Sequence, residues 1–360
     1  MKEQALALLK RLTEAHGAPS REEQVRAIFR AEVPAACEAD RMGNITCALR
    51  GRSERPRILI AGHMDEVGFM VHSITNEGLL RFVPLGGWWG HVLLAQRMRV
   101  LTQAEREIIG LVTSKPQHFL TAAEREKVLP IESMYIDIGA RDKKEAIETF
   151  GVRLGDTIVP DSPFTQMANP ELLLCKAFDN RVGMALTIQS AQMIAKEEHP
   201  NTVYCTATVQ EELGLRGAKT VGEMVDPDVA LILEGPPADD LPGIPTDERQ
   251  GVLGGGVQIR LLDTTAVSNH HLSRFVIRVA EEAQIPHQVT VRRSGGTDAG
   301  ALHLYKRGVP TVVLGVPARY IHTSNSIIHL QDYLSALQLV RTLVQRLGEE
   351  SVASLAPWTM

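Results

Sequence analysis

Two adjacent carboxylates, Glu211 and Glu212, stand where an apolar stretch of the sequence ends. The residues before them, 201–209 (NTVYCTATV), are rich in β-branched side chains and predict a strand. Gly214 and Gly217 follow and mark a tight exit from that strand. We therefore expect both acids at the carboxyl end of a strand, the edge of an α/β sheet where ligands bind. Without further support, such a pair is more often a solvated helix cap, so other residues must decide.

A histidine and an aspartate follow another apolar strand. The strand RILIAG is followed by HMDEVG, which contains His63, Asp65 and Glu66. An imidazole ligates a metal ion well, and a nearby carboxylate can hold the other ring nitrogen and fix its tautomer. A lone HxD pair is more often a surface turn, and Asp65 could equally be a helix N-cap. The pair therefore indicates a metal site only if further ligands reach the same place.

Three further strand ends carry side chains that can bind a metal ion. Asp179 follows the run LLLCKAF, and Glu234 directly follows VALIL. His322 lies after the last buried strand, PTVVLGV, and is closer to the strand end than His329, to which we assign a structural role. Asp179 could instead be a simple N-cap of the helix that follows it. Its alternative role is a carboxylate whose two oxygens bridge a pair of cations.

Six side chains thus come from five strand-to-loop junctions: His63, Asp179, Glu211, Glu212, Glu234 and His322. Mixed histidine and carboxylate ligands suit zinc, cobalt or manganese rather than a thiolate site or an oxygen-only calcium cage. Two such ions need about five protein ligands when one carboxylate is shared. One acid is then left over, and we expect it to act as a general base.

The composition indicates a globular chain without a nucleic-acid or membrane partner. Its 360 residues are 44% hydrophobic, enough to bury a large core, and this length favours two domains over one. The net charge is −5 and no long basic run occurs, so no nucleic-acid partner is expected. The sequence has neither an N-terminal signal pattern nor an apolar span of about 18 residues. We therefore expect a cytoplasmic protein with no membrane partner.

The cysteines Cys37, Cys47, Cys175 and Cys205 form no CxxC pair. Two of them lie inside apolar runs, where a reduced thiol behaves as a small hydrophobic side chain. The sequence therefore supports neither a disulfide framework nor a zinc ribbon.

A β-rich segment interrupts the elements that must position the six side chains. Residues 1–70 and 161–360 alternate helices with apolar strands and predict one discontinuous α/β domain. Residues 71–160 contain short β-like segments separated by glycines and polar turns, which predicts an inserted β-rich domain. Within the insert, residues 114–133 form a long loop with a charged centre and are predicted to be mobile.

Two helices are expected before the first strand. Lys2–His16 places its leucines largely on one face, as in an amphipathic packing helix. Ser20 followed by Glu23 has the spacing of a capping box, which predicts a second helix that runs through Val33. Neither helix carries a candidate ligand.

Five motifs occur in order over nearly the whole chain: HMDEVG, AFDNRVG, VQEELGLRGA, GGTDAGALHL and RYIHT. As a set, they resemble the M42 metallopeptidases, the group of tetrahedral and glutamyl-type aminopeptidases. The resemblance implies a mixed-sheet α/β/α metallopeptidase domain of the phosphorylase/hydrolase-like type, with an inserted small β-barrel-like dimerisation domain. It also implies a homo-oligomer whose dimers assemble into a dodecamer, with the long loop of the insert reaching a neighbouring subunit's pocket.

The resemblance also assigns roles to individual residues, with Asp179 shared between two divalent metal ions. One ion would be held by His63, Asp179 and Glu234, the other by Asp179, Glu212 and His322, with Asp65 orienting His63 and Glu211 as the general base. The implied enzyme is an aminopeptidase that removes N-terminal residues from peptide substrates by metal-activated water. Zinc or cobalt is the expected metal, with manganese as an alternative.

One position departs from the family's pattern. Glu234 stands where family aminopeptidases usually carry Asp, and in related co-catalytic zinc peptidases that exchange can accompany a different substrate end. A carboxypeptidase-like hydrolase therefore stays open, as do the endoglucanase described for some relatives and a non-catalytic scaffold subunit. A glycosidase needs two carboxylates about 5 to 10 Å apart on either side of a sugar. The adjacent Glu211 and Glu212, with two histidines in the set and only 4% aromatic residues, fit metal hydrolysis better.

Overall fold

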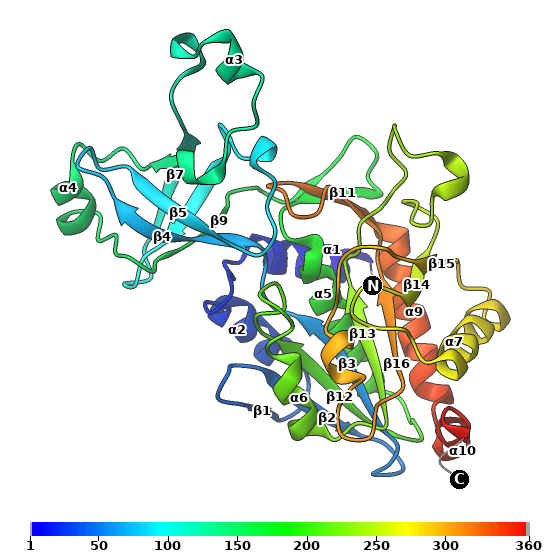
Figure 1. Ribbon diagram of the computed structural model, residues 1–360. Helices are drawn as coiled ribbons and strands as arrows, with labels where there is room; N and C mark the ends of the chain where they lie inside the picture. The colour runs from blue at the N-terminus through cyan, green and yellow to red at the C-terminus, as the bar shows by residue number, and fades with distance from the viewer. Residues whose placement is uncertain (1, 358–360) are drawn as a thin grey trace.

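The computed structural model describes residues 2–357 and is built around one eight-stranded sheet (Figure 1). The strands, in spatial order, are β1 (Cys37–Ala39), β2 (Ile45–Arg50), β12 (Thr202–Thr208), β3 (Arg57–His63), β13 (Val229–Glu234), β16 (Thr311–Gly315), β14 (Val257–Leu262) and β15 (His287–Val291). The central strands β12, β3, β13 and β16 are parallel, whereas β2 and β14 pair antiparallel with their central neighbours. The carboxyl ends of the four parallel strands therefore meet at one edge of a mixed sheet.

Alternate residues of the central strands pack against different helices. In β3, Ile58 and Ile60 belong to the larger core, whereas Leu59 and Ala61 belong to a separate one. The larger core includes α1 (Lys2–Glu14), α2 (Glu23–Glu32), α5 (Phe178–Ile194), α7 (His270–Glu282) and α9 (Leu330–Arg346), and the other includes α6 (Ala218–Val225) and α8 (Ala299–Leu302). Successive side chains of a strand point to opposite faces, so helices cover both sides of the sheet. The predicted α/β/α arrangement is confirmed.

A second, four-stranded sheet lies beside the helices and contains the strand that leads to Asp179. Its order is β10 (Thr165–Gln166), β11 (Leu172–Cys175), β18 (Ser326–His329) and β17 (Ala318–Arg319). The chain ends in the short helix α10 (Glu349–Ala353). None of the helices between residues 2 and 357 is long and apolar enough to cross a membrane.

A closed six-stranded barrel projects from the sheet, at the upper left of Figure 1. Its strands are β4 (Gly68–Ile74), β5 (Leu80–Leu85), β6 (Arg97–Leu101), β7 (Glu107–Thr113), β8 (Tyr135–Asp137) and β9 (Thr157–Pro160). It has its own core, in which Phe69 contacts both Phe82 and Trp88, and it carries the helix α4 (Lys143–Glu148). The β-barrel part of the predicted fold is confirmed.

The long segment of the insert is partly helical. Residues 114–133 contain the short helix α3 (Ala122–Arg125) between two 3₁₀ turns, Gln117–Phe119 and Ile131–Ser133. Thr121 and Glu124 form a capping box at the start of α3. In Figure 1 this segment extends away from the barrel strands.

The capping box expected at Ser20 is wrong. Ser20 has φ of 75°, in the left-handed region, whereas the first residue of a capping box typically has extended backbone angles. The second helix, α2, begins at Glu23 with Glu22 as its N-cap residue. The Glu22 carboxylate instead accepts hydrogen bonds from the backbone N–H groups of Ser20 (3.0 Å) and Gln210 (3.2 Å). Glu22 therefore ties the N-terminal segment to the loop that carries Glu211.

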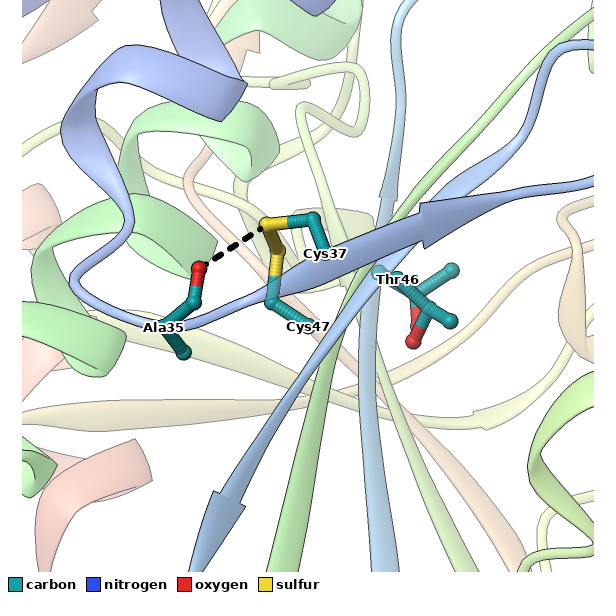
Figure 2. The surroundings of a disulfide bond; sticks show 5 residues. Ala35, Cys37, Thr46 and Cys47 are labelled. Carbon is teal, nitrogen blue, oxygen red and sulfur yellow. Dashed lines mark hydrogen bonds between the residues drawn. A yellow bond between two sulfur atoms is a disulfide. The ribbon is translucent and has the colours of Figure 1, made fainter.

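The expectation that the cysteines form no disulfide is also wrong. Cys37 and Cys47 are disulfide-bonded, with their Cα atoms 4.2 Å apart (Figure 2). They are register partners on the antiparallel strands β1 and β2, and the Asp40 carboxylate accepts three backbone N–H bonds in the turn between them. That register places the two cysteines directly opposite each other, which no spacing rule for CxxC pairs detects. Cys175 and Cys205 are free and buried, as expected.

Candidate metal centre

The six side chains singled out from the sequence lie together at the carboxyl edge of the central strands. His63 ends β3 and Glu234 ends β13, while Glu211 and Glu212 follow β12 and His322 follows β17. Asp179 lies at the start of α5, where its own backbone is not yet helical. One cavity of about 590 Å³ is lined by all six: His63, Asp179, Glu211, Glu212, Glu234 and His322.

Asp179 lies between the two histidines. Its Oδ1 atom is 3.2 Å from His63 Nε2, and its Oδ2 atom is 3.5 Å from His322 Nε2. Each carboxylate oxygen thus faces a different imidazole. This is the arrangement that a carboxylate shared between two metal ions would need.

The other three acids are distributed around the same two histidines. Glu234 Oε2 lies 3.7 Å and Glu211 Oε2 3.9 Å from His63 Nε2. Glu212 Oε2 lies 3.5 Å from His322 Nε2. Two sets of ligand atoms are close enough to hold a cation: His63, Glu211 and Glu234, and His63, Asp179 and Glu212. The first set includes Glu211, which was expected to be the base rather than a ligand.

Two carboxylate oxygens of this cluster have no hydrogen-bond partner in the part of the chain that is described. They are Glu212 Oε1 and Glu234 Oε1, and both are buried. Burying an anionic oxygen without a partner is costly, and a divalent cation would remove that cost. Imidazole and carboxylate donors without thiolate fit zinc, cobalt or manganese. The residues present therefore fit the predicted pair of ions.

Protons and metal ions would compete for this cluster. Burial, with the charge of Asp179, raises the pKa of Glu212 to about 8, and burial also raises the pKa values of Glu211 and Glu234 well above their ordinary value. Burial alone would lower the pKa of His322, but its hydrogen bond to Asp179 and the charge of Glu212 raise it to about 9. Metal binding should therefore release protons near neutral pH.

Asp65 contacts both halves of the centre. His63 Nδ1 lies 3.0 Å from the backbone carbonyl oxygen of Asp65, which can only accept, so Nδ1 carries a proton and Nε2 faces the acids. The Asp65 carboxylate lies 3.4 Å from Nδ1 and accepts hydrogen bonds from the backbone N–H groups of Glu211 and Glu212, both at 3.0 Å. Asp65 thus holds the two glutamates as well as the histidine that it was expected to orient.

A family model described as M42 glutamyl aminopeptidase matches residues 43–339. The match covers most of the chain. The chain belongs to the M42 peptidase family. Among known proteins, this M42 peptidase is 35% identical to the glutamyl aminopeptidase of Lactococcus lactis subsp. cremoris over 351 residues, 96% of this chain and 98% of the relative. The predicted family and enzyme class, an aminopeptidase, are confirmed.

Solved structures agree with the family match. A TET aminopeptidase from the marine sediment archaeon Thaumarchaeota archaeon SCGC AB-539-E09 superposes with a TM-score of 0.94 at 43% identity, covering 98% of this chain and 99% of that one. The TET1 peptidase of Pyrococcus horikoshii, which can assemble into a tetrahedron or a large octahedral shell, superposes with a TM-score of 0.84 at 31% identity. The second match covers 95% of this chain and 100% of that one.

One further acid near the centre of this M42 peptidase was not predicted from the sequence. Asp298 is buried, its Oδ2 atom accepts a hydrogen bond from the Thr208 hydroxyl, and its charge is one of the smaller causes that raise the pKa of Glu211. Asp298 lies in the motif GGTDAGALHL, which supported the resemblance without giving this residue a role. The presence of an acid in this motif could have identified Asp298 as a candidate site residue.

Proposed function

We propose that this chain is an aminopeptidase that uses two divalent metal ions, zinc or cobalt with manganese as an alternative. The observation that carries the proposal is the convergence of the predicted ligands around Asp179, whose two oxygens face the two histidines. The partnerless oxygens of Glu212 and Glu234 support the same conclusion, because each needs a positive charge.

We assign the two ions to overlapping ligand sets that share Asp179. One set is His63, Asp179 and Glu234, and the other is Asp179, Glu212 and His322. When bound, the two ions would polarise the scissile carbonyl group and lower the pKa of a water molecule. Asp65 would keep Nε2 of His63 free for ligation by holding a proton on Nδ1.

Glu211 is assigned the proton transfers. Its carboxylate is buried at the wall of the cavity, and burial raises its pKa, so it can hold a proton between two steps. Glu211 would accept the proton of the attacking water and deliver it to the departing amine. The backbone N–H bonds from Glu211 and Glu212 to Asp65 keep this carboxylate in place.

We infer which end of the peptide is cleaved from the family of this chain rather than from Glu234 alone. The longer Glu234 reaches the His63 side of the centre at 3.7 Å, so the exchange of Asp for Glu is compatible with a ligand role. The two proteins compared above at 35% and 43% identity are named aminopeptidases, which favours the N-terminal end of a peptide over the carboxypeptidase alternative. The endoglucanase alternative is less well supported, because the acids are gathered around two histidines instead of flanking a sugar-sized gap.

We further propose that residues 1–70 and 161–360 form the catalytic domain and that residues 71–160 form dimers. We expect these dimers to assemble into a dodecamer, and the tetrahedron or octahedral shell that the TET1 peptidase of Pyrococcus horikoshii can form supports assembly of this kind. The segment 114–133 extends away from the barrel and is the part of the insert that would reach a neighbouring subunit.

A release assay tests the proposed function. The chain is stripped with EDTA, reloaded with zinc, cobalt or manganese, and given matched peptides with free and blocked N-termini. We expect activity only after reloading and only on free N-termini. Release from the carboxyl end, or equal activity on blocked peptides, would contradict the aminopeptidase assignment. Activity on cellulose oligosaccharides without peptide cleavage would favour the glycosidase instead.

A further inference from the structure

Next to the candidate metal centre lies a second cluster of buried charges, which we call the clamp. It consists of Glu66, Lys176 and Arg181, all buried. Glu66 Oε1 and Oε2 accept hydrogen bonds from Lys176 Nζ at 2.6 and 2.7 Å, and Oε1 also accepts one from Arg181 Nη2 at 3.0 Å. Both oxygens of this carboxylate are therefore satisfied, in contrast to those of Glu212 and Glu234.

The clamp joins the two chain segments that carry the first ligands. Glu66 lies three residues after His63, while Lys176 and Arg181 lie on either side of Asp179. Arg181 Nε also donates to the carbonyl oxygen of Met64 at 2.9 Å, one residue after His63. The turn that presents His63 and the turn that presents Asp179 are thus fastened to each other at several points.

The N-terminal segment accepts hydrogen bonds from both cationic side chains of the clamp. Arg181 donates to the carbonyl oxygens of Leu12 (2.6 Å), Ala15 (3.1 Å) and Gly17 (3.3 Å), and Lys176 donates to that of Ala15 (3.0 Å). A Cβ atom at Gly17 would lie 2.3 Å from Arg181 Nη2. A side chain at position 17 would therefore have to displace the guanidinium group of Arg181.

The clamp adjoins the metal ligands through a small cavity. Glu66, Lys176, Asp179 and His322 all line this space of about 10 Å³. Movement of Glu66 or Lys176 would therefore shift the Asp179 carboxylate, which faces both histidines. Residues that hold metal ligands typically change metal affinity about 10–100-fold when they are replaced.

We propose that Glu66 is a positioning residue for the metal centre: by binding Lys176 and Arg181, it fixes the separation between His63 and Asp179. The inference rests on the proposed function, because it concerns the geometry of the ions assigned there. It assigns a role in metal binding to three residues that contribute no ligand atom.

Two variants of the clamp test the proposal. Glu66→Gln keeps the shape of the side chain but removes its charge. Gly17→Ala displaces Arg181 without removing any charge, and so provides a second route if the first variant does not fold. The matched control is Asp332→Asn, since Asp332 is a buried acid that accepts backbone bonds from Gly254 (2.8 Å) and Gly256 (2.7 Å) and lines neither cavity.

The measurements are zinc affinity by competition with a chelator, the visible absorption spectrum of the cobalt-loaded chain, and the melting temperature. We expect Glu66→Gln and Gly17→Ala to bind zinc at least about tenfold more weakly and to show an altered cobalt spectrum. Asp332→Asn should melt at a lower temperature than the wild type but keep the wild-type zinc affinity and cobalt spectrum. A Glu66→Gln chain with wild-type affinity and spectrum, or an Asp332→Asn chain with the same loss, would overturn the proposal. A wild-type chain that binds no metal would overturn the proposed function itself.

Discussion

The molecule contains two buried charged clusters side by side, and they are built in opposite ways. In the clamp, one carboxylate is surrounded by two cationic side chains and every oxygen is hydrogen-bonded. In the candidate metal centre, four carboxylates face only two histidines, and two of their oxygens lack partners among the described residues. Buried charges are tolerated when they are paired and are costly when they are not.

The difference indicates which cluster is complete with protein atoms alone. The clamp needs nothing further and can act as a fixed base. The candidate metal centre carries an excess of negative charge that its own residues do not balance. Burial and the neighbouring acids raise the pKa values of Glu211, Glu212 and Glu234. The pKa of Asp179 is lowered, because its hydrogen bonds with the two histidines outweigh its burial.

The largest loss of activity is expected from two variants that distinguish the roles of the adjacent Glu211 and Glu212. Glu211→Gln should lower kcat about 10²–10⁴-fold while the chain keeps its metal, because the base is lost and the ligands remain. Glu212→Gln should lose metal, because it removes a ligand beside His322. Metal analysis of the two purified variants, together with single-turnover rates, measures both effects. Equal metal loss in both variants would place Glu211 among the ligands instead.

Removal of the metal should destabilise the chain strongly. A ligand at about 1,000 times its dissociation constant stabilises the folded state by about 4 kcal/mol. We therefore expect EDTA-treated protein to unfold at clearly lower denaturant concentration than zinc-loaded protein. Chemical denaturation with and without zinc measures the difference. Coincident unfolding curves would mean that the excess negative charge does not require cations.

The metal-free chain should become less stable as the pH rises. Burial raises the pKa of Glu212 from 4.5 to about 8, so the folded chain holds a proton that the unfolded chain releases above pH 4.5. The raised pKa of His322, about 9 against 6.5, acts in the same direction, because its stabilisation is lost as the pH rises from 6.5 to 9. The raised pKa values of Glu212 and His322 together predict that the free energy of unfolding falls by an amount on the order of a few kcal/mol between pH 5 and 9.

Denaturation of EDTA-treated protein at several pH values measures this loss. Zinc should remove most of the pH dependence of the stability, because it replaces the protons bound to the metal ligands. A metal-free chain whose stability rises through the same interval would show that the carboxylates are ionised and tolerated without cations.

The smallest effect is expected at an exposed ion pair. Arg52 and Glu198 form a salt bridge in which both side chains are more than two-thirds exposed. Solvent screens such a pair, so Arg52→Ala should leave the melting temperature unchanged. A loss comparable to that of Glu66→Gln would show that burial does not distinguish the clamp from surface pairs.

The sequence predicts well which side chains lie together, because each follows an apolar strand. Parallel strands bring their carboxyl ends to one edge, so Glu211, Glu234 and His63 meet without any knowledge of their distances. The same reasoning could not distinguish a ligand from a base among adjacent acids. That distinction depends on ångström-scale placement around His63.

Contacts between distant segments could not be predicted from the sequence. Glu66 and Lys176 are 110 residues apart, and nothing in either motif indicates that they pair. Cys37 and Cys47 required the register of β1 on β2. Ser20 matched a capping box in letters, but its left-handed backbone excludes that role.

Diffraction from crystals grown with zinc, recorded at the zinc absorption edge, would show whether Asp179 is shared between two metal ions. We expect two anomalous peaks, one bounded by His63, Asp179 and Glu234 and the other by Asp179, Glu212 and His322. Asp179 should contribute one oxygen to each. An empty cavity, a single peak, or a pair of ions held without Asp179 would contradict it.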